Sequence, residues 1–181
     1  MTKQKIIGAA VLLALLPLSN SCQLSEDLNS TVAGGASSGA TPNTASLLEG
    51  VYIAMRNPFQ GPTNVFALSE VPTDERIMPT RAGDWDDNGV WRELHLQNWT
   101  ADNTQILNTF NGLNGVVFAG TDILQYGPTS QQAAEARFLR AYAMYWELDL
   151  FDQVPYRDPG EPVTQLARVR KGTEALDFII S

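Results

Sequence analysis

The sequence has very few of the residues that form disulfides and metal sites. Its 181 residues include one cysteine, Cys22, and one histidine, His95. A lone cysteine cannot form a disulfide within the chain, and a histidine with no second histidine or nearby cysteine argues against the common zinc ligand sets. We predict no metal site and expect His95 at the surface or packed against a loop.

Basic residues are also scarce. Twelve lysines and arginines stand against twenty aspartates and glutamates, a net charge of −8. Removal of the first 21 residues would leave ten basic against twenty acidic residues, a net charge of −10. This sign disfavours nucleic acids and anionic lipid surfaces as partners.

The apolar run at residues 6–16 is too short to cross a bilayer, and it follows two lysines, which is the layout of a secretory signal. The stretch "LSNSC" then places Cys22 where a bacterial lipoprotein signal has its acylated cysteine, although Ser19 stands where leucine is usual. We predict that residues 1–21 are a lipoprotein signal peptide and that lipidated Cys22 anchors the protein to a membrane. The alternative is an ordinary secreted protein, cleaved near Ser21, with an unmodified thiol.

Residues 22–43 are rich in glycine, serine, alanine and threonine, and we predict a flexible tether. Residues 44–181 suit one domain by length. Their last helical segment starts at Thr173 and stops after about two turns with apolar residues still to be covered. We therefore expect the sequence to be the N-terminal part of a longer protein.

Hydrophobic periodicity predicts helices without interleaved strands, an all-α fold. The first helix is expected to start at Ser46, in a capping box with Glu49, and to stop at Asn57 before a proline. Residues 59–99 show no sustained period, which predicts a long irregular excursion. Thr100 is expected to cap the second helical region.

Three glycines in the second helical region, Gly112, Gly115 and Gly120, predict close packing or a local break. Asn114 falls inside the apolar stripe of this region, and a buried amide needs hydrogen-bond partners. We predict a structural tie to a neighbouring loop; the alternative is a ligand contact.

The third predicted helix covers residues 134–151, with Ser130 as its N-cap. Its apolar residues occupy an arc of roughly 220°, well beyond the ~100° stripe of a one-sided helix. We expect other helices to cover it on two sides. Arg137 and Arg140 lie on the remaining face without an acidic neighbour three or four residues on. We predict structural partners for them elsewhere in the chain; the alternative is an anionic ligand.

The stretch "DWDDNG" places Asp84, Asp86, Asn88 and Gly89 as in half of a calcium loop, but His95 occupies the position of the bidentate glutamate. A solvated acidic turn is the default interpretation. No pair of acids is spaced for glycoside hydrolysis, so we predict no catalytic residue and no enzyme activity.

Three tryptophans, Trp85, Trp91 and Trp99, lie in or beside the excursion, where exposed indole rings could stack on sugar faces. Packing in the protein interior is the alternative. We retain Trp85 and Trp91 as candidate ligand contacts.

The stretch "AEARFLRAYAMYWELDLFDQVPY" resembles the signature segment of the SusD/RagB family of Bacteroidota outer-membrane lipoproteins. "ILNTFNGLNGVV", with Asn114 at the family's recurrent asparagine, and "RVRKGTEALDFII" resemble the helices on either side. Asp152 stands where the family usually has glycine. The resemblance covers nearly all of the mature chain but only the N-terminal part of the family's usual length.

This resemblance implies a scaffold of tetratricopeptide-like helix pairs with irregular excursions. It also implies a lipid-anchored protein on the extracellular face of the outer membrane that binds a glycan or another nutrient and delivers it to a SusC-like TonB-dependent transporter, without a cofactor or a covalent step. Two alternatives remain. A lipid-anchored binding subunit of an ABC importer would need alternating strands and helices, and a surface glycan hydrolase would need a positioned acid pair or triad.

Overall fold

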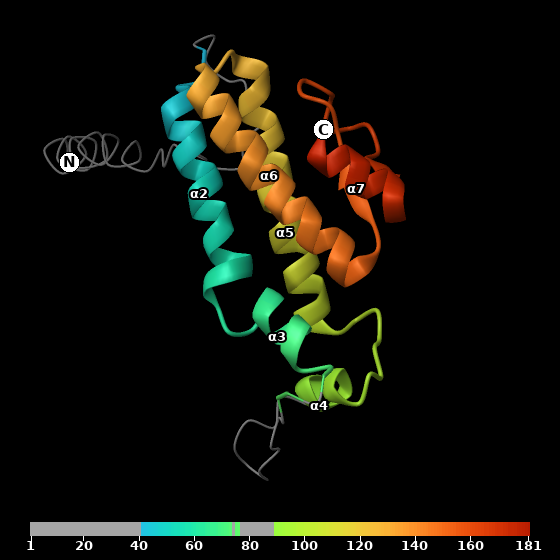
Figure 1. The fold of residues 1–181 in the computed structure, drawn as a ribbon. Helices are drawn as coiled ribbons and strands as arrows, with labels where there is room; N and C mark the ends of the chain where they lie inside the picture. Colours follow the sequence, from blue (N-terminus) through green and yellow to red (C-terminus); the bar gives the residue numbers. More distant parts are fainter. Residues whose placement is uncertain (1–40, 74, 77–88) are drawn as a thin grey trace, which may run out of the picture. The chain divides into compact units, whose positions relative to one another are not determined.

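The computed structural model describes residues 41–73, 75–76 and 89–181, all within the compact unit Ala33–Ser181 (Figure 1). These residues form α2 (Thr44–Gln60), α3 (Val65–Glu70), α4 (Val90–His95), α5 (Thr104–Asp122), the 3₁₀ helix η2 (Ile123–Tyr126), α6 (Ser130–Phe151) and α7 (Gly172–Ile180). Two antiparallel strands, β1 (Val154–Tyr156) and β2 (Arg168–Arg170), join α6 to α7. The predicted all-α class is confirmed for the described part of the chain, in which no helix is long and apolar enough to cross a membrane.

The three long helices begin at caps that the sequence interpretation missed. Asn43 caps α2 by accepting from the N–H of Ala45, so Ser46 is already inside the helix. Asn103 caps α5, three residues after the predicted Thr100. Thr129 caps α6 in a reciprocal capping box with Gln132, so Ser130 is the first helical residue instead of the cap. In each case the asparagine or threonine that reaches the free N–H groups defines the start.

Helix α2 does not stop before Pro58, as the sequence predicted, but continues to Gln60. A proline disfavours helical geometry in the preceding residue, but this is a bias that packing can override. Pro58 is fully buried, and the side-chain amide of Asn64 donates to the carbonyl of Asn57 at 2.7 Å. Burial and this extra hydrogen bond therefore hold the last turn in place.

The predicted irregular excursion at residues 59–99 contains two short helices, α3 and α4. They pack together through a small cluster of buried residues, Ala67, Val71, Trp91 and Leu94. The side chain of His95 lies with Nδ1 3.2 Å from the carbonyl oxygen of Val71, in the turn after α3, which confirms the expectation that it lies at the surface or packs against a loop.

Helices α2 and α6 run side by side in the same direction (Figure 1). Near their starts, the hydroxyl of Thr44 donates to Oε1 of Gln132 at 3.0 Å. Near their ends, the rings of Phe59 and Trp146 lie 6.4 Å apart. Helix α5 packs against both of them in the opposite direction, and the main core forms where these three helices meet β1 and α7.

Two of the three glycines of α5 lie at close helix contacts, as predicted. A Cβ on Gly120 would lie 3.0 Å from Cβ of Arg140 and 3.1 Å from the carbonyl oxygen of Ala136, and a Cβ on Gly112 would meet Asn57 at 3.1 Å. Gly115 has open space at the corresponding position, so close packing does not explain it.

The buried face of α6 overlaps only one edge of the predicted apolar arc. Its buried residues are Ala136, Leu139, Ala143, Met144 and Glu147. Aromatic residues from the middle of the predicted apolar arc are exposed: Phe138 by 67%, Tyr142 by 39% and Tyr145 by 46%. Helices α2, α5 and α7 all contact α6, so the expectation that other helices cover it on two sides is confirmed, whereas the middle of the predicted arc stays exposed. With Tyr52 of α2, these exposed residues form what we call the aromatic strip.

The end of α6 explains how the chain accommodates Asp152 at a position where the family that it resembles usually has glycine. Asp152 adopts a left-handed conformation (φ 50°) and donates its N–H to the carbonyl of Leu148, which closes the helix. Aspartate tolerates this conformation better than most residues other than glycine and asparagine. Its carboxylate then accepts from the N–H of Gly172 at the start of α7.

Candidate functional site

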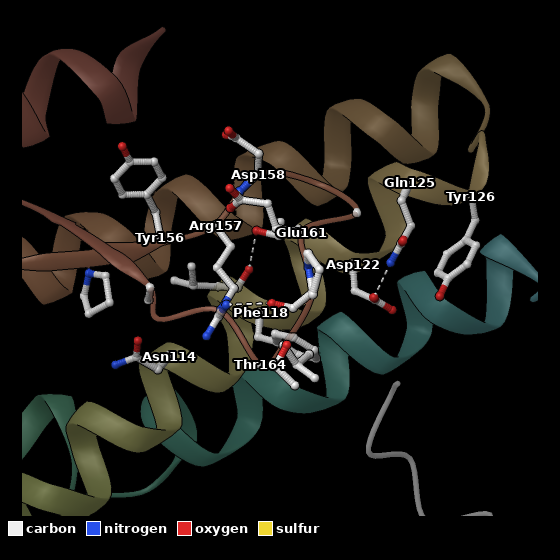
Figure 2. A pocket seen from close by; sticks show the side chains of 17 residues that line it. Asn114, Phe118, Asp122, Gln125, Tyr126, Tyr156, Arg157, Asp158, Glu161 and Thr164 are labelled. Atoms are coloured by element: carbon white, nitrogen blue, oxygen red, sulfur yellow. Dashed lines mark hydrogen bonds between the residues drawn. The ribbon is translucent and has the colours of Figure 1, made fainter. Parts of the chain in front are cut away.

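A hollow of about 570 Å³ lies between α5, η2 and the loop of residues 157–167 that connects the two strands. This volume is within the range of ~300–1,000 Å³ typical of small-molecule sites. Figure 2 shows side chains from the helices and from the loop converging on it. The helices contribute mainly Asn114, Phe118, Asp122, Gln125 and Tyr126; the strand and loop contribute Tyr156, Arg157, Asp158, Glu161 and Thr164.

The loop side of the hollow is held by ion pairs and a backbone bond. Arg168 donates through Nη2 to Asp158 and to Glu161, both at 2.8 Å. The N–H of Asp158 donates to the same Glu161 carboxylate at 2.6 Å, and Arg157 donates to the carbonyl of Pro162 at 3.0 Å. Because these charged groups bind one another, the loop has a defined shape although most of it is exposed.

The helix side carries a polar pair one turn apart. Gln125 donates through Nε2 to Oδ1 of Asp122 (Figure 2). Burial raises the pKa of Asp122 above its ordinary value, and the hydrogen bond from Gln125 offsets part of this effect. Burial, with a smaller contribution from Asp122, also raises the pKa of the Tyr126 phenol.

Asn114 lines the hollow, and its hydrogen bond differs from the one predicted. Its amide donates to the carbonyl of Phe110 within α5, at 2.9 Å, instead of tying the helix to a neighbouring loop. This bond to the residue four positions earlier satisfies the amide locally, as short polar side chains in helices often do. Figure 2 shows Asn114 at the opposite end of the hollow from Tyr126.

The predicted structural partners of Arg137 and Arg140 are missing from the described part of the chain. Arg137 is exposed, and Arg140 is half-buried. Burial lowers the pKa of Arg140, Arg137 lowers it further, and Asp158 raises it in part. Within the described residues neither arginine forms an ion pair, and Nε of Arg140 is buried without a hydrogen bond.

The candidate ligand contacts from the sequence are not at the hollow. Trp91 is 8% exposed and packs in the core cluster between α3 and α4, so little of its indole face is open to a sugar. Trp85, the acidic turn at residues 84–88 and the lipidation candidate Cys22 lie outside the described residues. Among the residues that are described, no group of three metal-ligating side chains comes together.

Glu147 is a buried acid that the sequence interpretation missed. It is 0% exposed, and neither carboxylate oxygen has a hydrogen-bond partner among the described residues. Burial raises its pKa to about 8. A signal was present in the sequence, because Glu147 follows Ala143 and Ala136 at helical spacing of four and eleven residues, on the face of α6 with the smallest side chains.

The described residues thus form an all-α fold with a hollow between α5, η2 and the loop that connects the two strands. No model of a known protein family matches the chain, and no curated protein matches it.

Proposed function

We propose that the protein is a cell-surface lipoprotein of the SusD/RagB type, which binds a glycan or another nutrient and delivers it to a SusC-like TonB-dependent transporter. In this proposal residues 1–21 are the signal peptide, Cys22 carries the lipid, and residues 22–43 tether the binding domain to the outer membrane. Ligand is bound and released without covalent chemistry.

One observation carries the proposal most strongly: the segment that resembles the family's signature, α6 with the turn into β1, is the central element of the described packing. Helix α6 contacts α2, α5, α7 and β1, and α2, α5 and α6 alternate in direction. Long helices that alternate in direction and pack against one another are what a tetratricopeptide-like array requires. The left-handed Asp152 supports the same proposal, because it gives the turn a conformation that glycine favours.

The aromatic strip supports a protein partner. Phe138, Tyr142 and Tyr145 expose large rings beside one another on α6, and Tyr52 of α2 joins them through a hydrogen bond to Glu135. Exposed aromatic residues in such a group are typical of interaction surfaces. The ABC-importer alternative is less compatible with the described residues, since their strands are three residues long and do not alternate with the helices.

The proposal is tested in a Bacteroidota host with an affinity tag at the C-terminus. We expect the wild-type protein to incorporate an alkyne-labelled fatty acid, to be cleaved by protease added to intact cells, and to co-purify with a large TonB-dependent barrel in mild detergent. The matched control is Cys22→Ala, which keeps the signal but removes the acceptor thiol and should lose the label. A labelled protein that never co-purifies with such a barrel would refute the transporter assignment.

A further inference from the structure

The hollow has the chemical character of a site for a polyhydroxylated ligand. Sugar rings present hydroxyl groups at their edges and apolar C–H faces, so their sites combine hydrogen-bonding groups with apolar or aromatic surface. The helix side of the hollow supplies both, with Asp122 and Gln125 next to the rings of Phe118 and Tyr126 (Figure 2). Thr164 faces them from the loop.

The charges at the hollow favour a neutral ligand. Asp158 and Glu161 share one partner, Arg168, so one of their two negative charges is compensated. Of the described residues that line the hollow, Arg157 is the one cation, and it donates to a backbone carbonyl. With Asp122, the hollow therefore has three carboxylates against the charges of Arg157 and Arg168, and this excess of negative charge would repel an anionic ligand.

The Asp122–Gln125 pair retains hydrogen-bonding capacity for such a ligand. A carboxylate has about four lone-pair sites, and the hydrogen bond from Gln125 uses one of them. The carbonyl oxygen of Gln125 is a further acceptor, and a Cβ on Gly160 of the loop would lie 3.8 Å from it, so loop and helix approach each other at this point. Adjacent acceptors on one helix turn suit the paired hydroxyl groups of a sugar ring.

We propose that this hollow binds a neutral oligosaccharide, with Asp122 and Gln125 accepting from its hydroxyl groups and Tyr126 packing against a ring face. The inference rests on the proposed function for the class of ligand, and it adds the site and the neutral charge of the sugar.

The test is calorimetric titration of the full-length lipoprotein in lauryldimethylamine oxide, a detergent without a sugar headgroup. The neutral probes are maltoheptaose, xylohexaose and mannohexaose, and tetragalacturonate is the anionic probe. Thr164→Trp fills the hollow from an exposed loop position, and Asp122→Asn and Tyr126→Ala remove groups on the helix side. The matched control is Leu166→Trp, in the same loop but outside the lining and 90% exposed. Thermal melting verifies that each variant is folded.

We expect at least one neutral probe to bind, Thr164→Trp and the helix-side variants to weaken it tenfold or more, and Leu166→Trp to stay within twofold of wild type. Binding of a neutral probe with equal affinity in wild type and hollow variants would overturn the site while leaving the proposed function standing. Binding of tetragalacturonate alone, or of none of the four probes, would overturn the neutral-saccharide class. Co-purification with the transporter, measured separately, then decides the proposed function.

Discussion

Replacing Glu147 with glutamine removes an ionisable group from the buried face of α6 without changing the shape of the side chain. The carboxyl is 0% exposed, it has no hydrogen-bond partner among the described residues, and burial raises its pKa to about 8 from an ordinary value of 4.5. In the unfolded chain the same carboxyl is solvated and ionises near its ordinary pKa. Folding therefore binds a proton at every pH between these two values.

The sign of the effect follows from this proton uptake. The native state binds more protons than the unfolded state between pH 4.5 and pH 8, so the free energy of unfolding falls as the pH rises through this interval and levels off above it. At about 1.4 kcal/mol per pH unit, the group costs roughly 3 kcal/mol at pH 7 and roughly 5 kcal/mol above pH 8. Below pH 4.5 both states carry the proton, and the cost disappears.

The assay is urea denaturation of wild type and Glu147→Gln at several pH values from 5 to 9, because the difference between the two proteins cancels the titration of all other groups. We expect wild type to lose roughly 4 kcal/mol relative to the variant between pH 5 and pH 8. Glu147→Met should show the same flattened profile, since it also removes the charge, whereas Glu49→Gln on the exposed side of α2 should keep the wild-type slope. If the free energies of unfolding of wild type and Glu147→Gln changed with pH in parallel, the interpretation of Glu147 as a buried, unpaired carboxyl would be refuted.

Three further predictions test local packing and capping. Gly115→Ala should raise the free energy of unfolding by about 0.5–1 kcal/mol through helix propensity. Gly120→Ala should lower it by about 1 kcal/mol, because the new Cβ would press on the backbone and on a Cβ of α6. Equal effects of the two substitutions in urea denaturation would contradict this difference in packing. Thr129→Ala should lower the free energy of unfolding by about 1 kcal/mol, and Ser130→Ala should lower it by less than about 0.5 kcal/mol. The reverse order in thermal melts would mean that Ser130, and not Thr129, is the N-cap. Arg168→Met should speed chymotryptic cleavage of the loop between β1 and β2, followed by mass spectrometry, since it removes both ion pairs; unchanged cleavage would mean that they do not hold the loop.

The helices were the most predictable part of the fold, because their signals are local. Periodicity and turn residues place the three long helices within a few residues of their observed bounds. The starts were wrong where two capping residues competed within a short stretch, as with Thr129 and Ser130. Which hydroxyl reaches the free N–H groups depends on backbone angles that composition does not specify. The continuation of α2 past Asn57 depends on the burial of Pro58, which is a tertiary effect.

The hollow could not be located from the sequence, because its walls are far apart along the chain. Asp122 and Gln125 lie on one helix turn and could have been recognised as a polar pair. Their position opposite Asp158 and Glu161 depends on the ion pairs of Arg168, which connect β2 back to the loop. The same ion pairs explain why a segment rich in proline and charge, which reads as an ordinary loop, has a defined shape at this site.

The face of α6 is the most instructive error. Counting apolar residues favoured the aromatic side of the helix, yet the buried side carries Ala136 and Ala143, with Gly120 of α5 against Ala136 and Arg140. Small side chains allow two helices to approach closely, so the contact between α5 and α6 at Gly120 and Ala136 depends on side-chain volume as well as hydrophobicity. Glu147 lies on this buried face and is 0% exposed, and its pKa rises because burial disfavours the charged carboxylate. The large rings of the aromatic strip lie on another side of the helix, where they are exposed and available to a partner.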